Sequence, residues 1–82
     1  MKSSDILLSL DGESLEVSKN SSGGINVCYK DAEIKDGMFL IYDFGRGSNF
    51  EEACDNYLSK IRGKKLVFDA HTEDRREIMV LG

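Results

Sequence analysis

An 82-residue chain with 40% hydrophobic and 32% charged residues is typical of one small globular domain, here residues 1–82. Its formal net charge of −4 disfavours a dedicated nucleic-acid binder, which normally carries a basic face. Two separated cysteines and one histidine exclude a structural zinc site, which needs about four such ligands at short spacing. No signal peptide or membrane-length apolar run is recognisable, so we expect a cytoplasmic protein without membrane association.

The first third of the chain predicts a short helix followed by strands. Residues 3–11 favour a helix, because Ile6, Leu7 and Leu10 share one helical face, although an edge strand is the alternative. Residues 14–18 and 25–30 alternate polar and apolar side chains, which indicates two strands joined by a polar, Gly-rich loop. The second strand is expected to continue beyond a bend to Ile34, and Asp36-Gly37 then marks a hairpin turn with positive φ at both central residues.

The next strand, residues 38–44, is apolar on both faces, which predicts a central position in its sheet. A helix covers only one face, so we expect the N-terminal helix, a curl of the sheet or a partner chain to cover Phe39 and Ile41. A two-sided central strand in so short a chain also predicts a homodimer. The predicted partner-binding site comprises this outward face and the nearby acids: Phe39, Ile41, Asp31, Glu33, Asp36 and Asp43.

A longer amphipathic helix is predicted near residues 49–62, with its apolar stripe at i, i+3, i+4, i+7, i+8 and i+11. Ser48 or Asn49 caps its start, with a glutamate three residues later, and Gly63 ends it in the left-handed conformation. Residues 66–70 and 76–81 are the last two strands. The order is α-β-β-β-α-β-β, and the expected fold class is a two-layer α+β fold in which the long helix packs across one antiparallel sheet.

No catalytic constellation is recognisable in the chain. No serine lies in a nucleophile elbow, and His71 is the single histidine available as a base. The paired acids lie at a helix start or in a loop, where solvent normally surrounds them. We therefore expect no enzymatic activity, no metal and no cofactor. Gly45, Arg46 and Gly47 form a weak candidate anion site before the helix, but the favoured interpretation is a turn capped by its own side chains. An alternative nucleic-acid-binding surface comprises six basic residues: Lys60, Arg62, Lys64, Lys65, Arg75 and Arg76.

The C-terminal half resembles a group of small phage and prophage proteins of unassigned function. The matching residues are Gly45, Gly47, Asn49-Phe50-Glu51-Glu52-Ala53, Tyr57, Lys60-Ile61, Gly63-Lys64, Leu66-Val67-Phe68, Ala70, Arg76 and Ile78. The resemblance implies a bacterial host and transfers no catalytic residue. A hairpin followed by a G-x-x-F-E-E-A helix also resembles the HicB antitoxin-like fold and, more distantly, double-stranded-RNA-binding domains. This chain lacks the HicB proline segment, and it has Glu51 and Glu52 where an RNA-binding helix would carry lysines.

These observations predict a small, non-enzymatic, phage-type accessory protein that binds and modulates a host protein, for example a defence nuclease or a replication factor. The alternative is a nucleic-acid-binding module, HicB-like or double-stranded-RNA-binding-like, that uses the basic residues after the long helix. The two predictions differ in salt dependence, because binding to a nucleic-acid backbone weakens steeply as salt rises.

Overall fold

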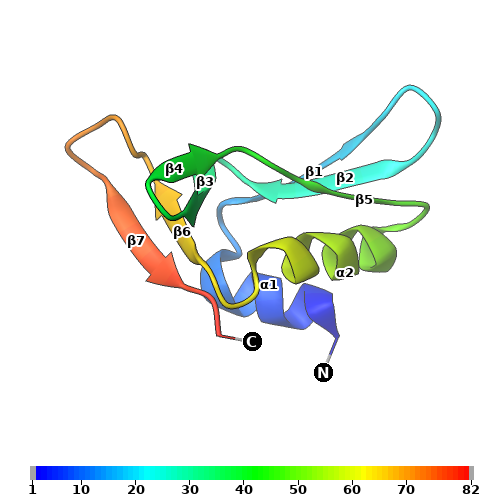
Figure 1. Ribbon diagram of the computed structural model, residues 1–82. Coiled ribbons are helices and arrows are strands. Elements are labelled where there is room, and N and C mark those ends of the chain that lie inside the picture. The colour runs from blue at the N-terminus through cyan, green and yellow to red at the C-terminus, as the bar shows by residue number, and fades with distance from the viewer. Residues whose placement is uncertain (1, 82) are drawn as a thin grey trace.

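Two helices and two small antiparallel sheets make up the part of the chain, residues 2–81, that the computed structural model describes (Figure 1). The helices are α1 (Ser3–Asp11) and α2 (Phe50–Ile61). The first sheet has the order β1-β2-β5 and contains β1 (Leu15–Lys19), β2 (Ile25–Tyr29) and β5 (Gly45–Gly47). The second sheet has the order β4-β3-β6-β7 and contains β3 (Ala32–Asp36), β4 (Phe39–Ile41), β6 (Lys65–Phe68) and β7 (Arg76–Met79).

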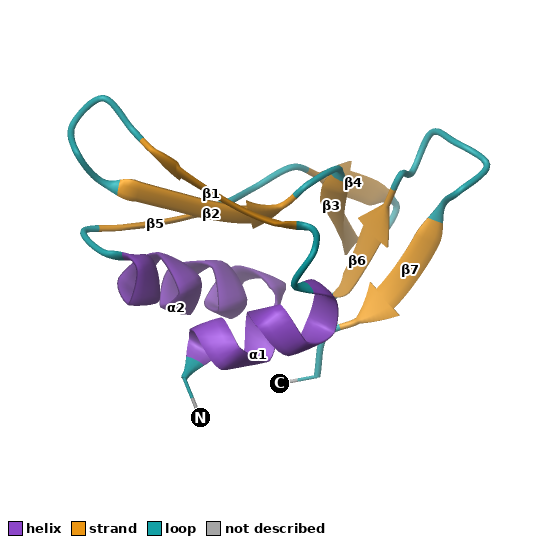
Figure 2. Ribbon diagram, turned by 180° about the vertical axis from the view of Figure 1, so that it is seen from behind, coloured by secondary structure: helices purple, strands orange, loops and turns teal. Residues whose placement is uncertain are grey.

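The helices lie side by side beneath the first sheet, and the second sheet lies beyond their C-terminal ends (Figure 2). The predicted α+β class, the N-terminal helix and the long helix are therefore confirmed. The expected single sheet is instead two sheets. A tight turn separates β2 from β3, and Asp31 in this turn has a φ of 58°. This turn redirects the backbone so that β3 joins a second sheet.

The predicted central position of residues 38–44 is wrong, because β4 is an edge strand of the second sheet. A two-residue turn at Gly37 and Met38 folds β4 back onto one side of β3, and β6 pairs with the other side. Gly37 alone of these two residues has positive φ, at 61°, which fits a hairpin turn with glycine at its first central position. The hairpin predicted from Asp36-Gly37 is confirmed, with its turn one residue later.

The core joins both helices to both sheets through aromatic side chains. The rings of Tyr29 and Tyr57 meet edge to face, with centroids 5.7 Å apart, and the centroid of the Phe68 ring lies 5.6 Å from that of Tyr29. Tyr29 donates its hydroxyl proton to the Leu7 carbonyl of α1, and its backbone N–H to the Tyr57 hydroxyl at 3.2 Å. One tyrosine thus connects β2 with both helices, and its buried hydroxyl and N–H both have partners.

The Gly45–Gly47 segment, predicted as a turn, forms strand β5 directly against helix α2. A Cβ atom at Gly47 would lie 2.5 Å from the backbone nitrogen of Ala53, and one at Gly45 would overlap the Ala53 carbonyl oxygen. These glycines allow strand and helix backbones to approach closely. Gly63 ends α2 with a φ of 78°, as predicted.

Candidate protein-binding site

Four large apolar side chains are exposed on and beside edge strand β4. Met38, Phe39, Ile41 and Tyr42 are 98%, 74%, 43% and 63% exposed, respectively. We call these four residues the β4 patch. Phe39 and Ile41 share one face of β4, and Met38 and Tyr42 alternate to the other. Exposed apolar residues grouped in this way mark interaction sites more often than scattered single residues do.

The register between β3 and β4 explains why this surface is open. Ile41 pairs with Ile34 and Phe39 pairs with Asp36, so Phe39 and Ile41 face the same side of the sheet as the buried Ile34. The core face of the second sheet therefore extends beyond the area that the helices cover. Of the three covers expected from the sequence, neither the N-terminal helix nor a curl of the sheet buries Phe39 and Ile41 among residues 2–81.

Two of the acids predicted for this site lie directly beside the β4 patch. Asp36 is the strand partner of Phe39, and Asp43 follows Tyr42 directly. Desolvation pushes the pKa of Asp43 upward, but hydrogen bonds from the Phe44 N–H at 2.8 Å and from Lys60 at 3.1 Å outweigh this effect and lower it below its usual range. This carboxylate therefore stays ionised and partly neutralised by Lys60.

The two remaining acids lie at the start of β3. Asp31 is close enough to Tyr42 for its charge to help raise the tyrosine pKa, although the main cause of that shift is the hydrogen bond between Tyr42 and Cys28. Glu33 lies on the outer face of the second sheet, 3.7 Å from His71. The structure thus places Asp31, Asp36 and Asp43 at the margins of the β4 patch. Glu33 lies on the outer face of the second sheet, away from this patch.

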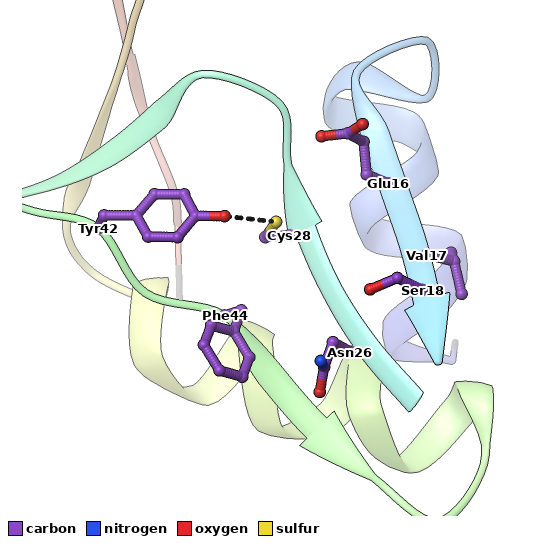
Figure 3. Close-up of a pocket in the computed structure, with 7 residues that line it drawn as sticks. All are labelled: Glu16, Val17, Ser18, Asn26, Cys28, Tyr42 and Phe44. Atoms are coloured by element: carbon purple, nitrogen blue, oxygen red, sulfur yellow. Dashed lines mark hydrogen bonds between the residues drawn. The ribbon is translucent and has the colours of Figure 1, made fainter. Parts of the chain in front are cut away.

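Tyr42 also connects the β4 patch to a hollow on the outer face of the first sheet (Figure 3). The hollow has a volume of about 300 Å³, and the Tyr42 hydroxyl reaches across to the Cys28 sulfur at 3.5 Å. Its lining consists of Glu16, Val17, Ser18, Asn26, Cys28, Tyr42 and Phe44. The sequence interpretation missed this site. Its signal was present in the alternate residues of strands 14–18 and 25–30, whose side chains point away from the helices.

The residues of the candidate anion site have structural roles, because the glycines allow close packing against α2 and the neighbouring side chains cap this helix. Asn49 accepts a hydrogen bond from the Glu52 N–H at 2.8 Å, and the Glu52 carboxylate accepts one from the Ser48 N–H at 3.1 Å. These side chains satisfy two of the backbone donors that an anion would use. Arg46 is exposed, and its guanidinium lies 5.5 Å from the centre of the Phe44 ring.

The six basic residues of the alternative surface are distributed over several elements, and four of them contact carboxylates. Lys60 lies 3.1 Å from Asp43, and Arg76 binds the Asp11 carboxylate across the molecule. Lys65 and Arg75 both contact Glu77, at 3.9 and 3.1 Å. Arg62 and Lys64 have no carboxylate within ion-pair distance in the described part of the chain. The positive charge that the sequence brings together is therefore largely compensated locally.

The remaining chemistry-bearing side chains do not converge. Among residues 2–81, no cluster of three or more histidine, cysteine or acidic side chains has the spacing of a metal site. The side chain of His71 is 85% exposed, and its Nε2 lies 3.7 Å from the Glu33 carboxylate. Burial raises the pKa of the Cys54 thiol to about 11, which keeps it protonated inside the core. No helix in this range is long and apolar enough to cross a bilayer.

Comparisons with protein-family models, with curated proteins and with solved structures find no match to this chain. The function must therefore be inferred from the chain's own residues, above all from the β4 patch.

Proposed function

We propose that the protein is a small, non-enzymatic accessory protein that binds another protein through the β4 patch. By its resemblance to phage and prophage proteins, the partner would be a cytoplasmic protein of a bacterial host, and binding would modulate that protein's activity. A defence nuclease or a replication factor is the kind of target expected. The observation that supports this proposal is the exposed, uncharged edge strand β4.

Edge strands normally carry features that prevent other strands from pairing with them, and the other edges of this protein have such features. Strand β1 carries Glu16 and Lys19, and β7 carries Arg76 and Glu77. Strand β5 carries Arg46. By contrast, no charged residue occurs from Gly37 to Tyr42. Charged side chains on an edge discourage further pairing, so β4 is the edge best suited to accept a strand from a partner.

Binding by strand addition would use two kinds of interaction. The unpaired backbone groups of β4 supply hydrogen bonds, and alternate side chains supply apolar contacts. Phe39 and Ile41 would contact the partner on one face, while Tyr42 would contact it beside the hollow. The acids Asp31, Asp36 and Asp43 would favour a partner with basic residues around its own apolar strand.

The test is affinity capture of the tagged protein from bacterial lysate, with and without nuclease, followed by mass spectrometry. Wild type should retain one stoichiometric protein after nuclease treatment, and Phe39→Asp should lose it. Met79→Asp is the matched control, because Met79 is 49% exposed on the opposite edge strand of the same sheet. It should capture the partner as wild type does.

Two outcomes would contradict the proposal. Equal capture by wild type and Phe39→Asp would remove the β4 patch as the binding surface. Capture that disappears with nuclease would instead support the nucleic-acid-binding alternative, and charge reversal at Lys64 would then weaken binding to all sequences alike.

A further inference from the structure

The free edge of β4 has a backbone geometry that suits one particular occupant. In an antiparallel pair, successive residues direct their N–H and C=O groups alternately toward the partner strand and away from it. Only two residues separate Asp36 from Phe39, so these paired residues direct their backbone groups toward each other across the hairpin. The backbone groups of Leu40, the next residue, therefore face the open edge.

We propose that a second copy of this chain occupies this edge, with β4 pairing antiparallel to β4 of the partner subunit across a two-fold axis at Leu40. This inference rests on the proposed function of the β4 patch as a protein-binding surface, and the second copy would compete with a host protein for the same edge. The two Leu40 residues would exchange both backbone hydrogen bonds. The two four-stranded sheets would then join into one continuous sheet.

The side chains of β4 are self-complementary in this register. Phe39 lies opposite Ile41 of the partner subunit on the core-facing side, and symmetry repeats this contact. Met38 lies opposite Tyr42 of the partner subunit. Aromatic side chains paired with β-branched or long apolar ones are favourable cross-strand neighbours. Each exposed residue of the β4 patch thereby gains an apolar neighbour.

Charge allows this pairing and gives it a characteristic salt dependence. The uncharged run from Gly37 to Tyr42 places no like charges directly opposite one another. At each end, however, Asp36 approaches Asp43 of the partner subunit, and each copy has a formal net charge of −4. Lys60 offsets part of this repulsion through its 3.1 Å contact with Asp43. Salt screens the remainder, so dimerisation should strengthen as salt rises, which is opposite to the behaviour of nucleic-acid binding.

The first experiment measures the molar mass of the purified chain by light scattering and sedimentation over a range of concentrations and salt. The mass should rise from 9.2 kDa toward twice that value with concentration, and should do so at lower concentration in high salt. Phe39→Asp should raise the dimer dissociation constant roughly tenfold or more, because it buries a charge against Ile41 of the partner subunit. Met79→Asp should leave the dissociation constant unchanged.

A second variant tests the register without depending on Phe39→Asp folding normally. Leu40→Cys, in a Cys28→Ser background, should form an intermolecular disulfide under mild oxidation, because hydrogen-bonded partners lie about 5.5 Å apart between Cα atoms. Met79→Cys in the same background should remain uncrosslinked. A strictly monomeric wild type, or crosslinking equal at both positions, would overturn the inference.

The two proposals fail separately. A monomeric chain that still captures a host protein through Phe39 would uphold the proposed function and reject the dimer. A dimer centred on Leu40 that captures no host protein would uphold the dimer and reject the proposed function.

Discussion

At the scale of single residues, Gly45 and Gly47 determine how closely strand β5 approaches helix α2. Both are buried, and a side chain at either position would overlap the backbone of Ala53. Backbone atoms on both sides leave little room for relaxation, which makes this contact different from a flexible side-chain clash. Arg46 between them is exposed, so the Gly-Arg-Gly sequence alternates between helix contact and solvent.

We expect Gly45→Ala to destabilise the fold by about 2–3 kcal/mol, since overpacking in a close-packed interior costs about this much. Urea unfolding followed by circular dichroism measures the change. Gly63→Ala is the matched control, because Gly63 has positive φ but open space around its Cβ position. It should cost only the strain of the left-handed conformation, about 1 kcal/mol. Equal losses would show that close approach is not the reason for glycine at position 45.

The sequence predicted individual residues well where the signal was local. Asn49 caps α2, and Gly63 ends it with positive φ. It also named Phe39, Ile41 and Asp36 for the candidate site. It does not indicate Met38 and Tyr42, because the apolar pattern predicts a central strand with their face covered by the long helix. Strand position in a sheet depends on which distant segment pairs with β3, and no local pattern around residue 40 encodes that choice.

At the scale of elements, two carboxylates of α2 bind the start of α1: Asp55 accepts a hydrogen bond from the Ser3 hydroxyl, and Glu51 binds Ser4. Glu51, in the first turn of α2, accepts hydrogen bonds from the Ser4 hydroxyl at 2.6 Å and the Ser4 N–H at 3.1 Å. The start of α2 therefore supplies an acceptor for an unpaired donor at the start of α1. The sequence predicted that Glu51 or Glu52 would complete the cap of α2 itself. Glu52 does so, whereas Glu51 binds a residue 47 positions away.

We expect Glu51→Gln to weaken the fold at neutral pH and to make its acid sensitivity smaller. The hydrogen bonds from Ser4 hold the pKa of Glu51 below its ordinary value of 4.5. The ionised group therefore stabilises the folded state above that pH, and the contribution disappears as pH falls through the lowered pKa. Stability measured from neutral pH to about pH 3 should converge for wild type and Glu51→Gln at the acid end.

Glu73→Gln provides the control for this comparison. Glu73 is exposed in the β6–β7 connection and has no ion pair or side-chain hydrogen bond within the described range. Its stability curve should follow that of wild type throughout. Parallel curves for wild type and Glu51→Gln, offset equally at every pH, would mean that the charge of Glu51 has no part in the helix joint.

At the scale of the whole molecule, the core is organised around hydroxyl groups as well as apolar surface. Tyr29 and Tyr57 are fully buried and connect β2, α1 and α2 through their hydrogen bonds. A chain of this size buries a smaller share of its surface than larger domains do. Loss of one such connection should therefore lower the stability of the whole fold. The ionisation of these hydroxyls should likewise be coupled to global unfolding.

Alkaline pH tests this coupling, since burial raises the pKa of Tyr57 from 10 to about 12 and raises that of Tyr29 as well. Only the neutral hydroxyl suits the folded core, so stability should be complete below pH 10 and should fall as pH rises from 10 through 12. The tyrosinate absorbance of the two buried tyrosines should appear in the same transition as the loss of native circular dichroism, whereas the exposed Tyr42 can ionise in the folded chain. Ionisation of all three tyrosines near pH 10 with native circular dichroism would contradict this prediction.

Tyr57→Phe separates the hydrogen bond from the ring. It keeps the edge-to-face contact with Tyr29 but leaves the Tyr29 N–H without its acceptor, which should cost about 1–3 kcal/mol at neutral pH. The variant should also lose less stability between pH 10 and pH 12 than wild type, because one buried ionisable group has been removed. A neutral-pH loss with an unchanged alkaline slope would assign the pH dependence to Tyr29 alone.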